Sequence, residues 1–102
     1  MNKERHNSKS SIPCRVTLGM FPDERGVSVD LPEGETIEIF AHKNHVIADQ
    51  DPVPGGEVKG RVIVRIVEKL EDSMVVDLPQ PGINVGMRHI VPKSMVKVGG
   101  DS

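Results

Sequence analysis

The chain has 102 residues, a formal net charge of −2, a single cysteine, and neither tryptophan nor tyrosine. This length suits one domain, and a single cysteine excludes an internal disulfide, which is typical of a reducing cytoplasm. The small net charge excludes a general attraction to nucleic acids or membranes, and no apolar run is long enough for a signal peptide or a membrane span. We therefore expect a cytoplasmic domain without a membrane partner.

The composition predicts an all-β fold. Valine and isoleucine greatly outnumber leucine and alanine, and the chain contains 10 glycines and 8 prolines. β-Branched side chains pack well on pleated strands, whereas glycine and proline mark turns. Because Phe21 and Phe40 are the only large aromatic residues, we expect short strands around a small aliphatic core.

The chain begins with a polar segment. Residues 1–12 are predicted to be a disordered tail, because nothing apolar follows Met1 before Ile12. The basic residues of this tail outnumber its one acidic residue, so the alternative is a basic arm that docks on an anionic partner. A single domain is expected over residues 13–98, and residues 99–102 are expected to form a C-terminal tail.

Apolar residues that alternate with polar ones, the period of a β-strand, predict three strands next. These strands cover residues 13–20, 27–31 and 36–41. A turn at 32–35 joins the last two into a hairpin. The alternation places Cys14 on the inward face, where a thiol is expected to be an inert small hydrophobe. The secondary structure of residues 42–47 is ambiguous from the sequence. Residues 49–59 are predicted to form an acidic loop.

The clearest strand pattern lies between residues 60 and 79. Apolar residues recur there at every second position, first at Val62, Val64 and Ile66 and then, after a polar turn, at Met74, Val76 and Leu78. This pattern predicts a hairpin over residues 61–78 as the centre of the fold.

The C-terminal part is predicted to contain a loop at 80–86, a strand at 88–91, one helical turn at 92–94 and a last short strand at 95–98. An echo of this segment occurs 50 residues earlier, where residues 38–48 match residues 88–98 at Lys43 and Lys93 and at the valines three residues later. We predict that both segments are a strand that ends in one helical turn and resumes, with Lys43 and Lys93 on equivalent turns.

The hexapeptide at 91–96, Val-Pro-Lys-Ser-Met-Val, resembles the end of SH3-like domains. In that family a strand runs into a one-turn 3-10 helix of the form Ile-Pro-Ser-x-Tyr-Val, and a final strand follows. The resemblance implies a small SH3-like barrel of five to six short antiparallel strands, whose closure removes exposed sheet edges. It does not imply a proline-rich ligand, because the aromatic residues that hold such ligands are missing and Met95 stands where the family has tyrosine.

Residues 34–39, Gly-Glu-Thr-Ile-Glu-Ile, are similar to a Gly-Glu-Ser-Ile-x-Ile segment of the carbon storage regulator family, which consists of small all-β dimers that bind RNA. The valine-rich segment 62–68, followed by Asp72, Pro81 and Arg88, is similar to the later part of that family. The resemblance implies RNA binding. The family's Leu-x-Arg motif is Leu-Pro-Glu at 31–33, with an acid in place of the arginine.

The sequence predicts neither a metal site nor a catalytic site. Zinc ligand types are present at His42, His45, His89 and Cys14, but only the first two have a ligand-like spacing, so surface histidines are expected. The acids of the loop at 49–59 match no calcium-binding pattern. No motif for nucleophilic catalysis or phosphate binding occurs. We therefore expect no enzyme activity and no cofactor.

A protein partner is the predicted ligand, bound at Ile83, Val85, Met87 and Arg88. The three apolar residues alternate within a loop, so an exposed row would form a contact surface to which methionine adapts easily. The alternative for this row is a sixth strand that closes the barrel. An exposed strand would also pair across a two-fold axis, so both a monomer and a homodimer remain open.

RNA binding by Arg61, Arg65 and Arg88 is the alternative function. Phosphate contacts require a cluster of basic side chains, and these three arginines would supply one if they shared a face. The other interpretation is that each arginine pairs with an acidic residue of a neighbouring strand.

Overall fold

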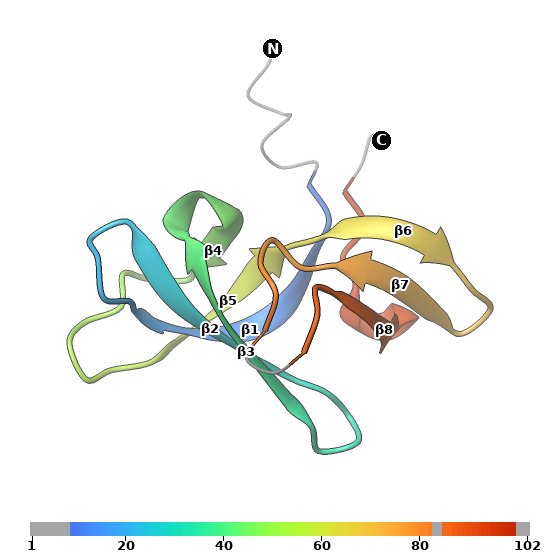
Figure 1. Ribbon diagram of the computed structural model, residues 1–102, viewed down its shortest axis with the longest axis horizontal. Coiled ribbons are helices and arrows are strands. Elements are labelled where there is room, and N and C mark those ends of the chain that lie inside the picture. The colour runs from blue at the N-terminus through green and yellow to red at the C-terminus, as the bar shows by residue number, and fades with distance from the viewer. Residues whose placement is uncertain (1–8, 83–84, 100–102) are drawn as a thin grey trace, which may run out of the picture.

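The computed structural model describes residues 9–82 and 85–99. In these ranges the chain forms eight strands in two antiparallel sheets and two 3-10 turns, and no helix there is long and apolar enough to cross a membrane (Figure 1). The all-β prediction is therefore confirmed, with more strands than the five or six expected. Most of the predicted tails, residues 1–8 and 100–102, lies outside the described residues, as does Ile83.

The first sheet has five strands in the order β3-β2-β1-β5-β4. Their bounds are Ser11–Leu18 for β1, Glu24–Asp30 for β2, Thr36–His42 for β3, Val46–Ala48 for β4 and Val58–Ile63 for β5. Strand β1 begins two residues before Pro13, because Ser11 and Ile12 pair with Ile63 and Val62 of β5 and are buried. The ambiguous segment at 42–47 contains the 3-10 turn η2 (Lys43–His45) and the start of β4.

The second sheet has the order β6-β7-β8. Its strands are β6 (Arg65–Lys69), β7 (Ser73–Asp77) and β8 (Arg88–Pro92), and the 3-10 turn η3 (Lys93–Met95) follows. The predicted central hairpin is therefore wrong in its first strand, which is divided between the two sheets at Val64. The Val64 N–H donates to the Ser10 carbonyl at 2.9 Å, one position beyond the last pair of β5 with β1, and β6 begins at the next residue. The apolar alternation continues across this break, so it does not reveal the division.

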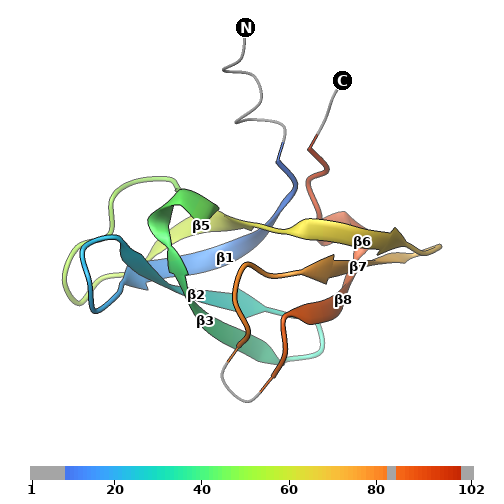
Figure 2. The same cartoon turned by 45° about the horizontal axis from the view of Figure 1, so that its top comes forward.

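Buried residues of the two sheets form one core, but the ladders of the sheets do not close into one barrel within the described residues (Figure 2). They are linked by the strand break at Val64 and by an isolated bridge between Ser11 and Lys97. The last strand predicted at 95–98 is reduced to this bridge in the part of the chain that the structure describes. The core is aliphatic and includes Cys14, as the alternation predicted, whereas Phe21 and Phe40 are exposed.

The two halves of the chain repeat one arrangement. In residues 11–48 a strand, a hairpin, a 3-10 turn and a short pairing segment follow one another, and the same order recurs in residues 61–98. The Lys43 N–H donates to the Asp23 carbonyl at 2.7 Å, and the Lys93 N–H donates to the Asp72 carbonyl at 3.1 Å. The residues before the two turns have nearly the same backbone angles, φ −66° and ψ 143° against φ −60° and ψ 144°. The predicted equivalence of the two lysine turns is confirmed.

The pairing between the halves has the pattern of an approximate two-fold axis. Ile47 of the first half pairs with Arg61 of the second, and Lys97 of the second half pairs with Ser11 of the first. Adding 50 to position 47 gives position 97, and subtracting 50 from position 61 gives position 11. The offset of 50 therefore converts the first pair into the second. Ile12 lies opposite Val62, its own equivalent, in the antiparallel ladder of β1 and β5. The axis therefore passes between Ile12 and Val62.

Shortening Ile12 tests the contribution of the buried side chains at this axis. Ile12 is almost fully buried, so Ile12→Ala leaves a cavity and is expected to lower the free energy of unfolding by about 2–5 kcal/mol. Ile90 is 63% exposed on β8, so Ile90→Ala is the matched control and is expected to change stability by less than about 0.5 kcal/mol. Urea unfolding measures both, and equal effects of the two substitutions would contradict this assignment of the core.

Candidate functional site

Two arginines share one carboxylate on the second sheet. Asp77 ends β7 and lies opposite Arg65 of β6 and Arg88 of β8. These three residues form a row across the strands, here called the arginine row. Arg65 Nη2 donates to Asp77 Oδ2 at 2.8 Å, and Arg88 donates through Nε to Oδ1 at 2.8 Å and through Nη2 to Oδ2 at 3.1 Å. The cross-strand register therefore brings together two of the three predicted arginines.

The row has one more positive charge than negative charge. The Asp77 residue is only 8% exposed, whereas the two guanidinium groups lie largely in solvent. The hydrogen bonds from Arg88 lower the pKa of Asp77 below its usual range, an effect that desolvation opposes and Arg65 reinforces. The bond to Asp77 in turn raises the pKa of Arg88. The Asp77 carboxyl is thus ionised at neutral pH, and two arginine side chains are exposed side by side on it.

A groove of about 480 Å³, here called the C-terminal groove, lies beside this row. Basic side chains on its border come from Lys9, His45 and Arg65, which belong to three separate segments of the chain. Its apolar surface is aliphatic and consists of Ile63, Val64, Leu78, Pro79 and Met87. The groove therefore combines positive charge with apolar contact area.

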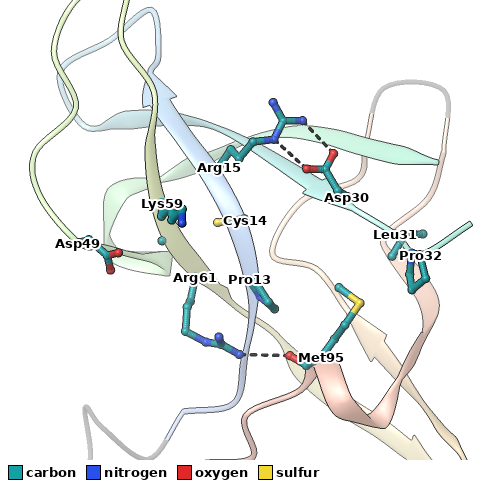
Figure 3. Close-up of a pocket in the computed structure, with 11 residues that line it drawn as sticks. Pro13, Cys14, Arg15, Asp30, Leu31, Pro32, Asp49, Lys59, Arg61 and Met95 are labelled. Carbon is teal, nitrogen blue, oxygen red and sulfur yellow. Dashed lines mark hydrogen bonds and ion pairs between the residues drawn. The ribbon is translucent and has the colours of Figure 1, made fainter. Parts of the chain in front are cut away.

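A larger groove of about 610 Å³, the N-terminal groove, lies on the first sheet (Figure 3). At one end, Asp30 of β2 accepts two 2.9 Å hydrogen bonds from Arg15 and one of 2.8 Å from Thr36. The bonds from Arg15 are the main reason that the pKa of Asp30 is lowered. At the other end, Arg61 Nη2 donates to the Met95 carbonyl at 3.2 Å.

The two grooves are equivalents in the two halves of the chain. The tetrapeptide Val-Asp-Leu-Pro occurs at 29–32 and again at 76–79, and both copies supply groove residues. In each copy the aspartate binds an arginine of the preceding strand, and the leucine N–H donates across the hairpin, to the carbonyl of Glu35 at 2.8 Å or of Met87 at 2.9 Å. This repeat is not among the features predicted above, although the identical tetrapeptides are a signal in the sequence that reveals it.

The predicted partner-binding residues fall in different surroundings. Met87 and Arg88 lie at the C-terminal groove and the arginine row, and Val85 is half-buried against the core. Arg61 lies apart from the other two predicted arginines, in the N-terminal groove. Its guanidinium donates to Ser11 Oγ at 2.8 Å and to the Ser11 carbonyl at 3.1 Å.

The histidines and the cysteine are scattered. The rings of His42 and His45 are 6.4 Å apart, and His42 Nδ1 accepts a hydrogen bond from the Asn44 N–H. His89 Nε2 lies 2.8 Å from the carbonyl of Gly86. Burial raises the pKa of the Cys14 thiol to about 12, although Arg61 opposes this shift, so the thiol is unreactive at neutral pH. Within residues 9–82 and 85–99, no three ligand side chains are placed to hold a metal ion.

Comparisons of this chain with models of known protein families, with curated proteins and with solved structures give no match. The chemistry of the two grooves is therefore the basis on which a function is inferred.

The arginine row is expected to make the free energy of unfolding fall as the pH is lowered into the acid range. A carboxyl whose native pKa is lowered stabilises the fold fully above its ordinary pKa of about 3.9, and this contribution is lost as the pH falls through the native pKa. Asp77→Asn is therefore expected to lower the urea midpoint at pH 7, with the difference from the unmodified chain shrinking below about pH 4. Asp51→Asn, in an exposed loop, serves as the control. A difference that stays constant from pH 7 to pH 3 would disprove the role of the Asp77 charge.

Proposed function

We propose that this chain is a non-enzymatic protein-interaction module that binds an extended, acidic segment of a partner protein in the C-terminal groove. The observation that carries the proposal is the arginine row on Asp77, two exposed guanidinium groups beside an aliphatic groove. Arginine side chains form paired hydrogen bonds with carboxylates, so they favour glutamate or aspartate in the partner.

Charge complementarity supports an acidic partner. The whole chain carries a net charge of −2. Lys9 and Arg65 nevertheless line the C-terminal groove, and Arg88 lies beside it on Asp77, the single carboxylate of the described lining. A local excess of positive charge on an acidic protein attracts an acidic segment and sets its orientation. Because Asp77 already holds both arginines in place, little ordering of these long side chains is needed on binding.

The apolar surface of the groove favours a peptide over RNA. Its aliphatic side chains, among them the partly exposed Met87, suit leucine, valine or isoleucine side chains of a partner. Single-stranded RNA is usually held by bases that stack on aromatic residues, and neither phenylalanine lines this groove within the described residues. RNA binding, which the resemblance to the carbon storage regulator family implies, is therefore the competing outcome. The experiment below must distinguish it from peptide binding.

An SH3-like arrangement of the second half is part of the proposal. Support comes from the path after β8, where the chain enters the single 3-10 turn η3 and then pairs with β1 through Lys97. This order of a strand, a one-turn helix and a returning segment is the order that the SH3-like resemblance implies.

Titration with a defined acidic peptide tests this function. The probe is a terminally blocked decapeptide of alternating glutamate and leucine, added to isotope-labelled protein and followed by the NMR signals of the arginine side chains. Arg65→Gln removes one charged hydrogen-bond donor and is expected to weaken binding roughly tenfold at this groove. Lys69→Gln removes the same charge from the same strand outside the groove, and it is expected to leave the affinity unchanged.

Two outcomes would overturn the proposal. One is an affinity that falls equally with Arg65→Gln and Lys69→Gln, because binding would then reflect general charge alone. The other is that a uridine dodecamer shifts the Arg65 and Arg88 signals in a strongly salt-dependent way while the peptide shifts neither. Urea unfolding of each variant shows that the fold is retained.

A further inference from the structure

We propose that the N-terminal groove is a second docking site for an acidic segment, so that one chain holds two such segments related by the approximate two-fold axis. This inference rests on the proposed function of the C-terminal groove. It extends that function to residues on the opposite side of the axis.

Corresponding residues line the two grooves. Arg15 and Asp30 of the N-terminal groove occupy the places of Arg65 and Asp77, and both copies of the Leu-Pro dipeptide line a groove. The correspondence includes residues from the opposite half, since Lys59 matches Lys9 at the same offset of 50 as the two turns. A side chain from each half therefore completes the groove of the other half, as a two-fold axis requires.

The positive charge available to a ligand lies at a different point in the N-terminal groove. Arg15 is neutralised there, because it donates to the carboxylates of both Asp30 and Glu57 at 2.9 Å. Arg61, in contrast, donates to neutral oxygens of Ser11 and Met95, so its charge has no carboxylate partner in these contacts. A ligand carboxylate is therefore expected at Arg61 rather than at Arg15.

Lys59 adds a second cation beside Arg61. Both residues belong to β5 and are two positions apart, so they share one face of the strand. Within the described residues Lys59 forms no ion pair, although the carboxylate of Asp49 also lines this groove. Apolar surface for a neighbouring aliphatic side chain of the ligand is supplied by Pro13, Leu31, Pro32 and Met95.

Both grooves are open at the same time. The residues that line one groove do not recur in the lining of the other, and the arginine–aspartate pairs of the two grooves belong to different sheets. A partner that carries two acidic segments, or a partner that is itself a dimer, would therefore gain affinity from the second contact without any new chemistry. This is the class of partner that the two grooves fit.

Methionine methyl groups report on each groove separately. Met95 lines the N-terminal groove, Met87 lines the C-terminal groove, and Met74 is buried in the core. The experiment labels the methionine methyl carbons of the full chain and adds the blocked glutamate–leucine decapeptide. The Met87 and Met95 signals are expected to shift while that of Met74 stays still.

Charge removal then assigns each signal to its groove. Lys59→Gln is expected to weaken the response of Met95 roughly tenfold and to leave that of Met87 intact, whereas Arg65→Gln does the reverse. Lys59 is the residue of choice, because Arg61 also ties β1 to the η3 turn and its loss can unfold the chain. Lys69→Gln is the charge-matched control and leaves both responses unchanged.

The outcomes separate this inference from the proposed function. A response of Met87 alone, unaffected by Lys59→Gln, overturns the second site and leaves the C-terminal groove as the binding site. A response of neither methionine overturns both proposals. A response of Met95 alone also overturns both, because the peptide would then occupy one groove, and not the one assigned to the function.

Discussion

The fold depends on the antiparallel pairing of β1 with β5, in which Ile12 of the first half lies opposite Val62 of the second. Each half sends its last segment to the first strand of the other half, so β4 pairs with β5 and Lys97 pairs with Ser11. Gly60 permits the first of these contacts, since a Cβ there would lie 2.5 Å from the carbonyl oxygen of Ile47. The halves therefore stabilise each other, because the five-stranded sheet takes strands from both.

The two grooves follow from this exchange. The same four residues, Val-Asp-Leu-Pro, end a strand in each half. In each copy the valine is buried, the aspartate binds an arginine and the proline lines a groove. Local sequence thus produces the same local structure twice. The surroundings then differ in charge, because Glu57 neutralises Arg15 on the first sheet, whereas Arg88 adds a second cation on the other.

Placement on strands makes both grooves well suited to binding. Arg65, Asp77 and Arg88 belong to three paired strands, and Lys59 and Arg61 to a strand paired on both sides. Side chains that paired strands hold in position lose little further freedom when a ligand arrives. The aliphatic core has no aromatic residue among its members within the described residues.

The sequence by itself determined the all-β class, most strand positions, the inward face that holds Cys14 and the equivalence of the turns at Lys43 and Lys93. These features depend on a period of two and on local turn chemistry, which neighbouring residues control. Only the tertiary structure decided that the chain changes sheet at Val64, and that Arg65 and Arg88 meet on Asp77 while Arg61 lies in another groove. Alternation shows which face a residue occupies but not which strand lies beside it, because strand pairing is set by contacts between residues far apart in the chain.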